Sequence, residues 1–200
     1  MAHGSTYVVK YRRRRENKTD YRKRLKLLKS SLPRFVVRRS LNNFVGQVII
    51  YENGIDKTLI TIHSKRLEKE FGWKGHRGNL PSAYLTGLLL GLEAKKKNIN
   101  KGILDIGRYT PSKGNSLFAF LKGLLDAGIE IPYNEEILPS EDRIKGEHIK
   151  KYALILKEKD PEKYKRQFSK YLERSLPPEK ITEHFEMVKS KILSKYGLER

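Results

Sequence analysis

Residues 34–63, RFVVRRSLNNFVGQVIIYENGIDKTLITIH, decide the fold class. β-branched and aromatic residues gather in three runs, at 34–39, 44–51 and 58–63, and such runs indicate β-strands. Asparagines separate the first two runs, and Asn53-Gly54 separates the second from the third. Because Asn-Gly between two apolar runs is a strong hairpin signal, the stretch predicts three consecutive antiparallel strands.

Helices and strands are predicted to alternate after these three strands. A helix begins at Asn79 or Ser82 and ends at Lys97, since leucines recur at helical spacing and lysines follow them. A short apolar run at 102–107 indicates a buried strand, a second helix begins at Asn115 or Ser116 and ends near residue 128, and 129–131 predicts a last strand. The order predicts an α/β domain with a mixed sheet, whose last strands pair in parallel through right-handed crossovers.

The remaining chain is predicted to be loop and helix. The glycine-punctuated stretch 72–78 favours a loop without regular structure. Helices are predicted at 144–158, 161–171 and 178–195, the last two with proline in the first turn. Their apolar stripes are thin, so we expect this part to pack on the body or on a neighbour rather than to form a large core of its own.

Positive charge is concentrated at the N-terminal end. The whole chain carries a net charge of +20, and residues 1–40 hold 14 Lys and Arg against 2 Asp and Glu. Four adjacent arginines repel one another without an anionic partner, so the arm is expected to be disordered alone, with a short helix at 21–30 when a partner supplies counter-charge. We therefore divide the chain into a basic arm (1–32), an α/β core domain (33–135) and a C-terminal helical extension (136–200).

Several classes of protein are disfavoured by composition. The chain has no cysteine, which excludes disulfides, thiolate metal sites and a cysteine nucleophile and fits a reducing compartment. The N-terminus lacks the apolar core of a signal peptide, and no stretch is long enough to cross a membrane. Five histidines show no zinc-ligand spacing. We expect a cytoplasmic protein with no metal, no cofactor, no membrane partner and no small-molecule substrate.

The arm is the strongest candidate for a binding function. Arginine offers a planar fork of donors to phosphates and stacks on unpaired bases, and tyrosines add aromatic faces. The alternative is a solvated tail that serves solubility or nuclear import. No helix-turn-helix, zinc finger or basic zipper is present, so RNA is favoured over DNA. The candidate residues of the arm are Arg12, Arg13, Arg14, Arg15, Lys18, Tyr21, Arg22, Lys23 and Arg24.

Three further segments have weaker signals for RNA contact. Arg38 and Arg39 end a predicted strand beside a turn containing Ser40, Asn42 and Asn43, although neighbouring strand residues face opposite ways and the charges could simply protect an edge. The loop 72–78 offers Lys74, His76 and Arg77, or is a plain exposed loop, with Trp73 packed inside. The loop 110–115, which contains Lys113, leads into a helix N-terminus, a natural anion site.

Catalysis has little support in the sequence. A metal-dependent ribonuclease needs a cluster of acids, and the acids near strand ends, Asp105, Asp126 and Glu135-Glu136, each have ordinary structural roles open to them. We expect a protein that is not an enzyme. A basic protein that coats RNA without specificity remains the main alternative.

Several ordered blocks resemble a known family. TDYRKRL at 19–25, PRFVVRRS at 33–40, GNLPSAYLTGLL at 78–89, LDIG at 104–107, DAGIEIP at 126–132 and RIKGEHI at 143–149 are similar to the archaeal and eukaryotic ribosomal protein eighteen family, whose eukaryotic relative is called large-subunit protein five. The resemblance spans about residues 7 to 155, with a weaker echo near 176–185.

The resemblance implies a fold and a function. It implies a ribonuclease H-like fold of translational-machinery components and a structural protein of the large ribosomal subunit that binds 5S rRNA in the central protuberance. The implied neighbours are 23S rRNA, a second 5S-binding ribosomal protein and other central-protuberance proteins. The implied RNA contacts are the arginines of the arm together with Arg38, Arg39, Asn42 and Asn43. We extend these contacts to His63, Ser64, Lys74, Arg77 and Lys113.

Overall fold

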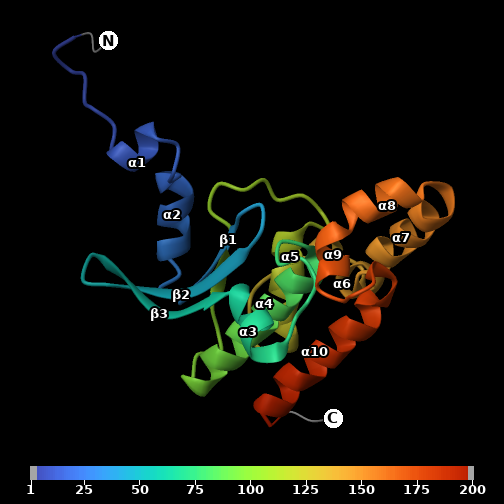
Figure 1. The fold of residues 1–200 in the computed structure, drawn as a ribbon. Helices are drawn as coiled ribbons and strands as arrows, with labels where there is room; N and C mark the ends of the chain where they lie inside the picture. The colour runs from blue at the N-terminus through green and yellow to red at the C-terminus, as the bar shows by residue number, and fades with distance from the viewer. Residues whose placement is uncertain (1–3, 198–200) are drawn as a thin grey trace.

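The computed structural model describes residues 4–197. Four strands form one open sheet in the order β3-β2-β1-β4, namely β1 (Arg34–Arg39), β2 (Phe44–Glu52), β3 (Ile55–His63) and β4 (Ile103–Asp105). β1 pairs with β2 and β2 with β3 in antiparallel fashion, whereas β1 and β4 run parallel (Figure 1). The predicted α/β fold, with three antiparallel strands and a parallel fourth, is confirmed.

The turn between β2 and β3 is the predicted hairpin. Asn53 and Gly54 both have positive φ, +49° and +82°, as the two central residues of a type I′ turn require. Pairing continues up to the turn, where Glu52 lies opposite Ile55. β3 therefore begins at residue 55, three residues earlier than its run of β-branched residues predicts.

The predicted strand at 129–131 is wrong. Only one parallel bridge joins Lys101 and Glu130, made by hydrogen bonds from Glu130 N to Asn100 O (2.8 Å) and from Gly102 N to Glu130 O (3.1 Å). Ile129 and Ile131 are buried, which explains the apolar signal. Pro132 follows directly and has no N–H to donate, so the ladder does not continue.

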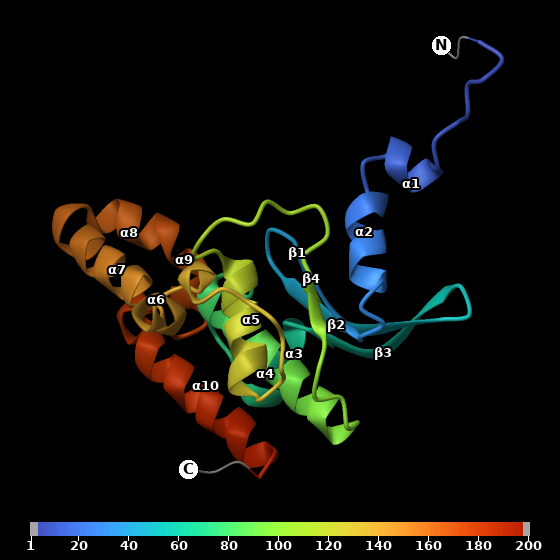
Figure 2. The same cartoon turned by 180° about the vertical axis from the view of Figure 1, so that it is seen from behind.

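Two long helices cover one face of the sheet, α4 (Leu80–Lys96) and α5 (Ser116–Asp126) (Figure 2). Asn79 caps α4 by accepting a hydrogen bond from Ser82 N at 3.1 Å. The helices approach closely because Gly87 and Gly123 have no side chain, and a Cβ atom at Gly87 would collide with the backbone oxygen of Phe120. α3 (Lys65–Phe71), to which the sequence assigned no element, buries Leu67 and Phe71 and ends at Gly72.

The C-terminal part folds onto this body. The helices are α6 (Glu141–Lys145), α7 (Glu147–Lys159), α8 (Pro161–Gln167), α9 (Ser169–Glu173) and α10 (Ile181–Lys195), with 3-10 turns η1 (Glu135–Ile137) and η2 (Pro178–Lys180). The predicted helix 144–158 is divided at Gly146, whose φ is +91°. α10 contributes Ile181, Phe185, Val188 and Ile192 to the main core, while α7 to α9 share a small cluster around Phe168.

The arm extends away from the body and contains two helices, α1 (Arg12–Arg15) and α2 (Tyr21–Leu28) (Figure 1). The sequence predicts disorder here, and the structure differs because local bonds hold both turns. Asp20 caps α2 by accepting hydrogen bonds from Arg22 N (3.0 Å) and Lys23 N (3.2 Å). Neither helix contains a fully buried residue, so the arm adds little to the hydrophobic core.

Among residues 4–197, no helix combines the length and the apolar character needed to cross a bilayer.

Candidate nucleic-acid interface

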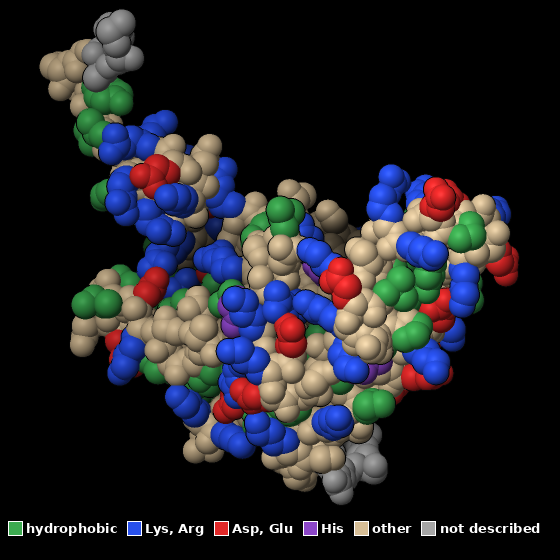
Figure 3. Space-filling view, in the orientation of Figure 1, with side chains coloured by type: hydrophobic (Ala, Val, Ile, Leu, Met, Phe, Trp, Pro, Cys, Tyr) green, Lys and Arg blue, Asp and Glu red, His purple; other side chains and the backbone are tan. Residues whose placement is uncertain are grey.

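The arm presents its cations to solvent. Lys and Arg side chains cover most of its surface in Figure 3, and every residue of α1 is exposed. Glu16 lies 3.9 Å from Arg12 Nε and 2.8 Å from Lys18 Nζ, whereas Arg14 and Arg15 form no ion pair within residues 4–197. Exposed ion pairs such as Arg12–Glu16 contribute little to stability, so the guanidinium groups of Arg12, Arg14 and Arg15 are available to phosphates.

Two contacts fix the arm to the body. Arg24 donates two hydrogen bonds to Asp56 on β3, at 2.7 and 3.0 Å. On the other side, Arg108 donates to the side-chain oxygen of Asn17 at 3.0 Å. Burial opposes ionisation of Asp56, but the bonds from Arg24 and the charge of Arg34 outweigh it and lower the pKa of Asp56. Arg24, predicted as an RNA contact, is therefore bound within the protein.

A buried arginine lies behind the Arg24–Asp56 contact. Arg34 is 4% exposed and donates to Asp56 at 2.7 Å and to Asp105 at 3.0 Å. Asp105 also accepts a hydrogen bond from Gly107 N at 2.8 Å. The Nε atom of Arg34 is buried without an acceptor in the described part of the chain. This network joins β1, β3 and β4 on the sheet face that the arm covers.

Three of the four acids considered for catalysis are bound by other side chains. Asp105 is bound by Arg34, Asp126 accepts from Tyr84 Oη at 2.7 Å, and Glu136 lies 2.7 Å from Lys113 Nζ. Among residues 4–197, no group of three or more His, Cys, Asp or Glu side chains is arranged to hold a metal ion.

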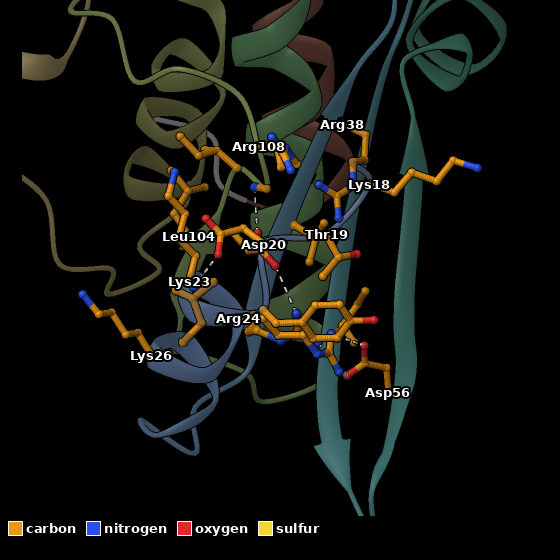
Figure 4. Close-up of a pocket in the computed structure, with 18 of the residues that line it drawn as sticks. Lys18, Thr19, Asp20, Lys23, Arg24, Lys26, Arg38, Asp56, Leu104 and Arg108 are labelled. Carbon is orange, nitrogen blue, oxygen red and sulfur yellow. Dashed lines mark hydrogen bonds and ion pairs between the residues drawn. The ribbon is translucent and has the colours of Figure 1, made fainter. Parts of the chain in front are cut away.

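A cleft of 730 Å³ lies between the arm and the sheet. Figure 4 shows side chains that line it from both sides, among them Lys18 and Lys23 from the arm and Arg38 and Arg108 from the body, with Lys18 extending outward. Lys18, Lys23 and Arg38, but not Arg108, belong to the predicted RNA contacts. Arg108 follows β4 in a loop, and its position near the arm depends on the fold.

Arg38 and Arg39 point to different places, as strand alternation predicts. Arg38 lines the cleft, whereas Arg39 Nη1 donates to Ser116 Oγ at 3.2 Å. The hydroxyl of Tyr109 donates to the backbone oxygen of Arg39 and accepts from its N–H. Only Arg38 therefore shares a surface with the cations of the arm.

The turn after β1 meets the loop 72–78. Ser40 Oγ accepts from Asn43 N at 3.0 Å and shapes the turn, and the side-chain oxygen of Asn42 lies 3.3 Å from His76 Nε2. Ser64, also predicted as an RNA contact, is fully buried and accepts from Phe44 N at 3.1 Å. Its hydroxyl supports the turn from inside the fold.

A second, smaller basic pocket of 90 Å³ joins this loop to the C-terminal helices. Its lining residues come from the turn, the loop and α9, and they are Asn42, Lys74, His76, Arg77, Lys170, Tyr171 and Arg174. Tyr171 Oη accepts from His76 N at 3.2 Å. Burial, followed by the nearby cations, lowers the pKa of His76 and favours its neutral form. Lys170 and Arg174 were missed because charges on a polar helix resemble a solvated face.

Three other residues that the sequence analysis singled out, Trp73, His63 and Lys113, line neither of these two pockets. Trp73 is buried, as predicted, with His184 stacked on it at 5.1 Å. His63 Nδ1 accepts from Lys65 N at 3.0 Å, and burial and Lys65 lower its pKa. The N–H groups that begin α5 are bound by the Asn115 side chain, so the predicted anion site near Lys113 is already capped.

A comparison with known protein families matches the segment that contains the arm. The matching family is described as ribosomal large subunit proteins 60S L5 and 50S L18, and the match runs from residue 5 to residue 101. It covers α1 to α4 and β1 to β3, and hence the arm, the turn at 40–43 and the loop 72–78. The match spans 97 of the 200 residues, and over residues 5–101 the chain is similar to the ribosomal large subunit proteins 60S L5 and 50S L18.

Proposed function

We propose that this protein is a component of the large subunit of the cytoplasmic ribosome, where it binds 5S rRNA and anchors it in the central protuberance. The observation that carries the proposal is the arm, which extends from the body in Figure 1 and has exposed arginines on α1, while Arg24 and Asn17 fix its base to the sheet and the β4 loop. A cationic arm held at its base presents its charge to RNA in one place. Contacts to 23S rRNA and to a second 5S-binding ribosomal protein complete the proposed role.

The arm and the body have different tasks in this proposal. Phosphates of RNA are bound by the arginines of α1, and binding releases counterions. The body recognises the shape of a structured RNA through groups fixed on rigid elements, since proteins recognise double-stranded RNA largely by shape. Arg38 on β1 and the loop 72–78 supply such groups. The role is structural, and the acids near the strand ends are occupied by Arg34, Lys113 and Tyr84.

Paired double substitutions test the role of the arm. Replacing Arg14 and Arg15 by Ala removes two cations that have no ion partner within residues 4–197. The slope of log Kd for 5S rRNA against log salt should then become shallower by roughly one and a half units, because each phosphate contact contributes about 0.7 to 0.9. The measurement is a filter-binding titration of purified protein at several salt concentrations.

The matched control removes two exposed lysines of α8, Lys163 and Lys165, and leaves the arm intact. The proposal expects this control to keep the original slope. Equal changes in both double variants would show that only the total charge matters, and the arm would lose its assigned role.

A further inference from the structure

We propose that the cleft between the arm and the sheet holds unpaired nucleotides of an RNA strand, with a base on its apolar floor and phosphates on its basic rim. The inference rests on the proposed RNA-binding function and adds a defined site to it. Its volume of 730 Å³ lies in the range of roughly 300–1,000 Å³ found for pockets that enclose organic ligands.

The floor of the cleft suits the flat face of a base. Apolar side chains come from the sheet, the β4 loop and α2, and they are Tyr21, Leu27, Val36, Ile49, Leu104 and Ile106. Arg34 and Ile49 lie opposite each other in the β1–β2 pairing, and Arg34 carries its charge into the same cleft while bound to two aspartates. Arg34 is only 4% exposed, so it contributes positive charge beneath the floor, and a base can lie on the partly exposed aliphatic groups above it.

The rim of the cleft suits phosphates. Eight Lys and Arg side chains line the cleft against three Asp. Asp56 and Asp105 are bound by arginines, and Asp20 caps α2, so the remaining cations face the opening without competition from these acids. A single strand with alternating bases and phosphates matches a cleft whose floor is apolar and whose rim is positive.

Arg38 is the best placed of these cations. It forms no hydrogen bond or ion pair by its side chain within residues 4–197, and it lies over Gly107, where a Cβ atom would collide with its guanidinium. Gly107 has φ +61°, which glycine adopts without strain. Glycine at this position thus leaves room for Arg38 at the mouth of the cleft.

The shape of the cleft distinguishes single strands from duplexes. The base of the arm is joined to β3 by the contact of Arg24 with Asp56 and to the β4 loop by the contact of Asn17 with Arg108. The bases of a duplex are stacked on one another and present only their edges, so a duplex cannot place a base face on Ile49 and Leu104, which line the cleft and are partly exposed. The site is therefore assigned to unpaired nucleotides.

Binding of a short RNA measured by fluorescence anisotropy tests the site. The probes are a fluorescent hexauridylate, a six-base-pair RNA duplex and uridine monophosphate as competitor, each with the full chain. Ile49→Glu places a carboxylate on the floor, and Ile55→Glu makes the same change at the hairpin tip, where Ile55 is 69% exposed and outside the cleft. Ile49→Glu should weaken hexauridylate binding roughly five- to tenfold, and Ile55→Glu less than twofold.

A second pair of variants keeps the test valid if Ile49→Glu disturbs the sheet. Arg38→Ala removes an exposed cation of the rim, and Lys57→Ala removes an exposed cation of β3 outside the cleft. Arg38→Ala should weaken hexauridylate binding several-fold more than Lys57→Ala. Equal effects within both pairs, or stronger binding of the duplex than of the hexamer, would overturn the site.

Two further outcomes test the nucleotide site separately from the proposed function. Competition by uridine monophosphate as strong, per mole, as that by unlabelled hexauridylate would make the cleft a mononucleotide site and overturn its assignment to an RNA strand. Titration of the same variants with 5S rRNA reports on the proposed function. If 5S rRNA binds tightly while the cleft variants behave like their controls, the nucleotide site fails and the proposed function stands.

Discussion

At the scale of single residues, Asp56 connects the arm to the core. It accepts from Arg24 on the arm and from the buried Arg34 of β1, so one carboxylate serves two guanidinium groups. Arg34 cannot turn to solvent, because its side chain is almost fully enclosed. The arrangement makes Asp56 the residue whose loss affects both the position of the arm and the stability of the sheet.

Asp56→Asn should lower the free energy of unfolding by about 1–3 kcal/mol, a value reduced from that of a buried pair because Asp56 is partly exposed. Urea unfolding followed by circular dichroism measures this change. Glu52→Gln, on the same hairpin and exposed, is the control and should leave stability within about 0.5 kcal/mol. No loss in the Asp56 variant would show that Asp105 alone satisfies Arg34.

The pKa of Glu70 tests the contact between α3 and α10. Hydrogen bonds from Arg66 and then Lys195 lower the pKa of Glu70 to about 2. Because the folded pKa lies below the unfolded value, this contribution to stability is present above about pH 4.5 and is lost as the pH falls toward 2. Lys195→Met should raise the pKa of Glu70 toward its ordinary value, and Lys191→Met should not. NMR titration of the Glu70 carboxyl carbon gives both values, and an unchanged pKa in Lys195→Met contradicts the assigned contact.

At the scale of elements, the close contact between α4 and α5 depends on glycines, which have no side chain. Gly87→Ala places a methyl group against the backbone of Phe120, which cannot move as a side chain can. We expect a loss of stability of at least about 2 kcal/mol. Gly72→Ala, at a position with positive φ and open space, should cost about 1 kcal/mol by backbone strain alone. Thermal unfolding of both variants compares them, and an equal cost would argue against close packing of the two helices.

Elements governed by local signals were predictable from sequence. The hairpin at Asn53-Gly54 and the helix capped by Asn79 follow from a few neighbouring residues, and both are confirmed. The strand at 129–131 was wrong because strand formation depends on a partner ladder, and Pro132 ends the donors there. Helix α3 was missed because only Leu67 and Phe71 mark its buried side.

The candidate site was predictable only in part. The arginines of the arm stand out by composition alone. Other features depend on contacts between distant segments of the chain. Arg24 is bound by Asp56, Arg108 approaches the arm, and Arg174 approaches the loop 72–78. No local pattern in the sequence specifies such pairing.

At the scale of the whole molecule, charge and shape support the same role. The arm carries a large share of the net charge of +20, while the sheet, the long helices and α10 form one core. The rigid body positions the cleft and the loop 72–78, and the arm extends the basic surface outward (Figure 3). The arrangement suits a protein that fixes one structured RNA in a larger assembly.

The most direct test of this role is a filter-binding titration of the full chain with 5S rRNA, with tRNA as competitor, at a low and a high salt concentration. A specific 5S rRNA-binding protein should retain 5S rRNA against an equal mass of tRNA, and its binding should weaken steeply as salt rises. Equal competition by tRNA would rule out this specificity, because it would leave only a basic protein that coats any RNA.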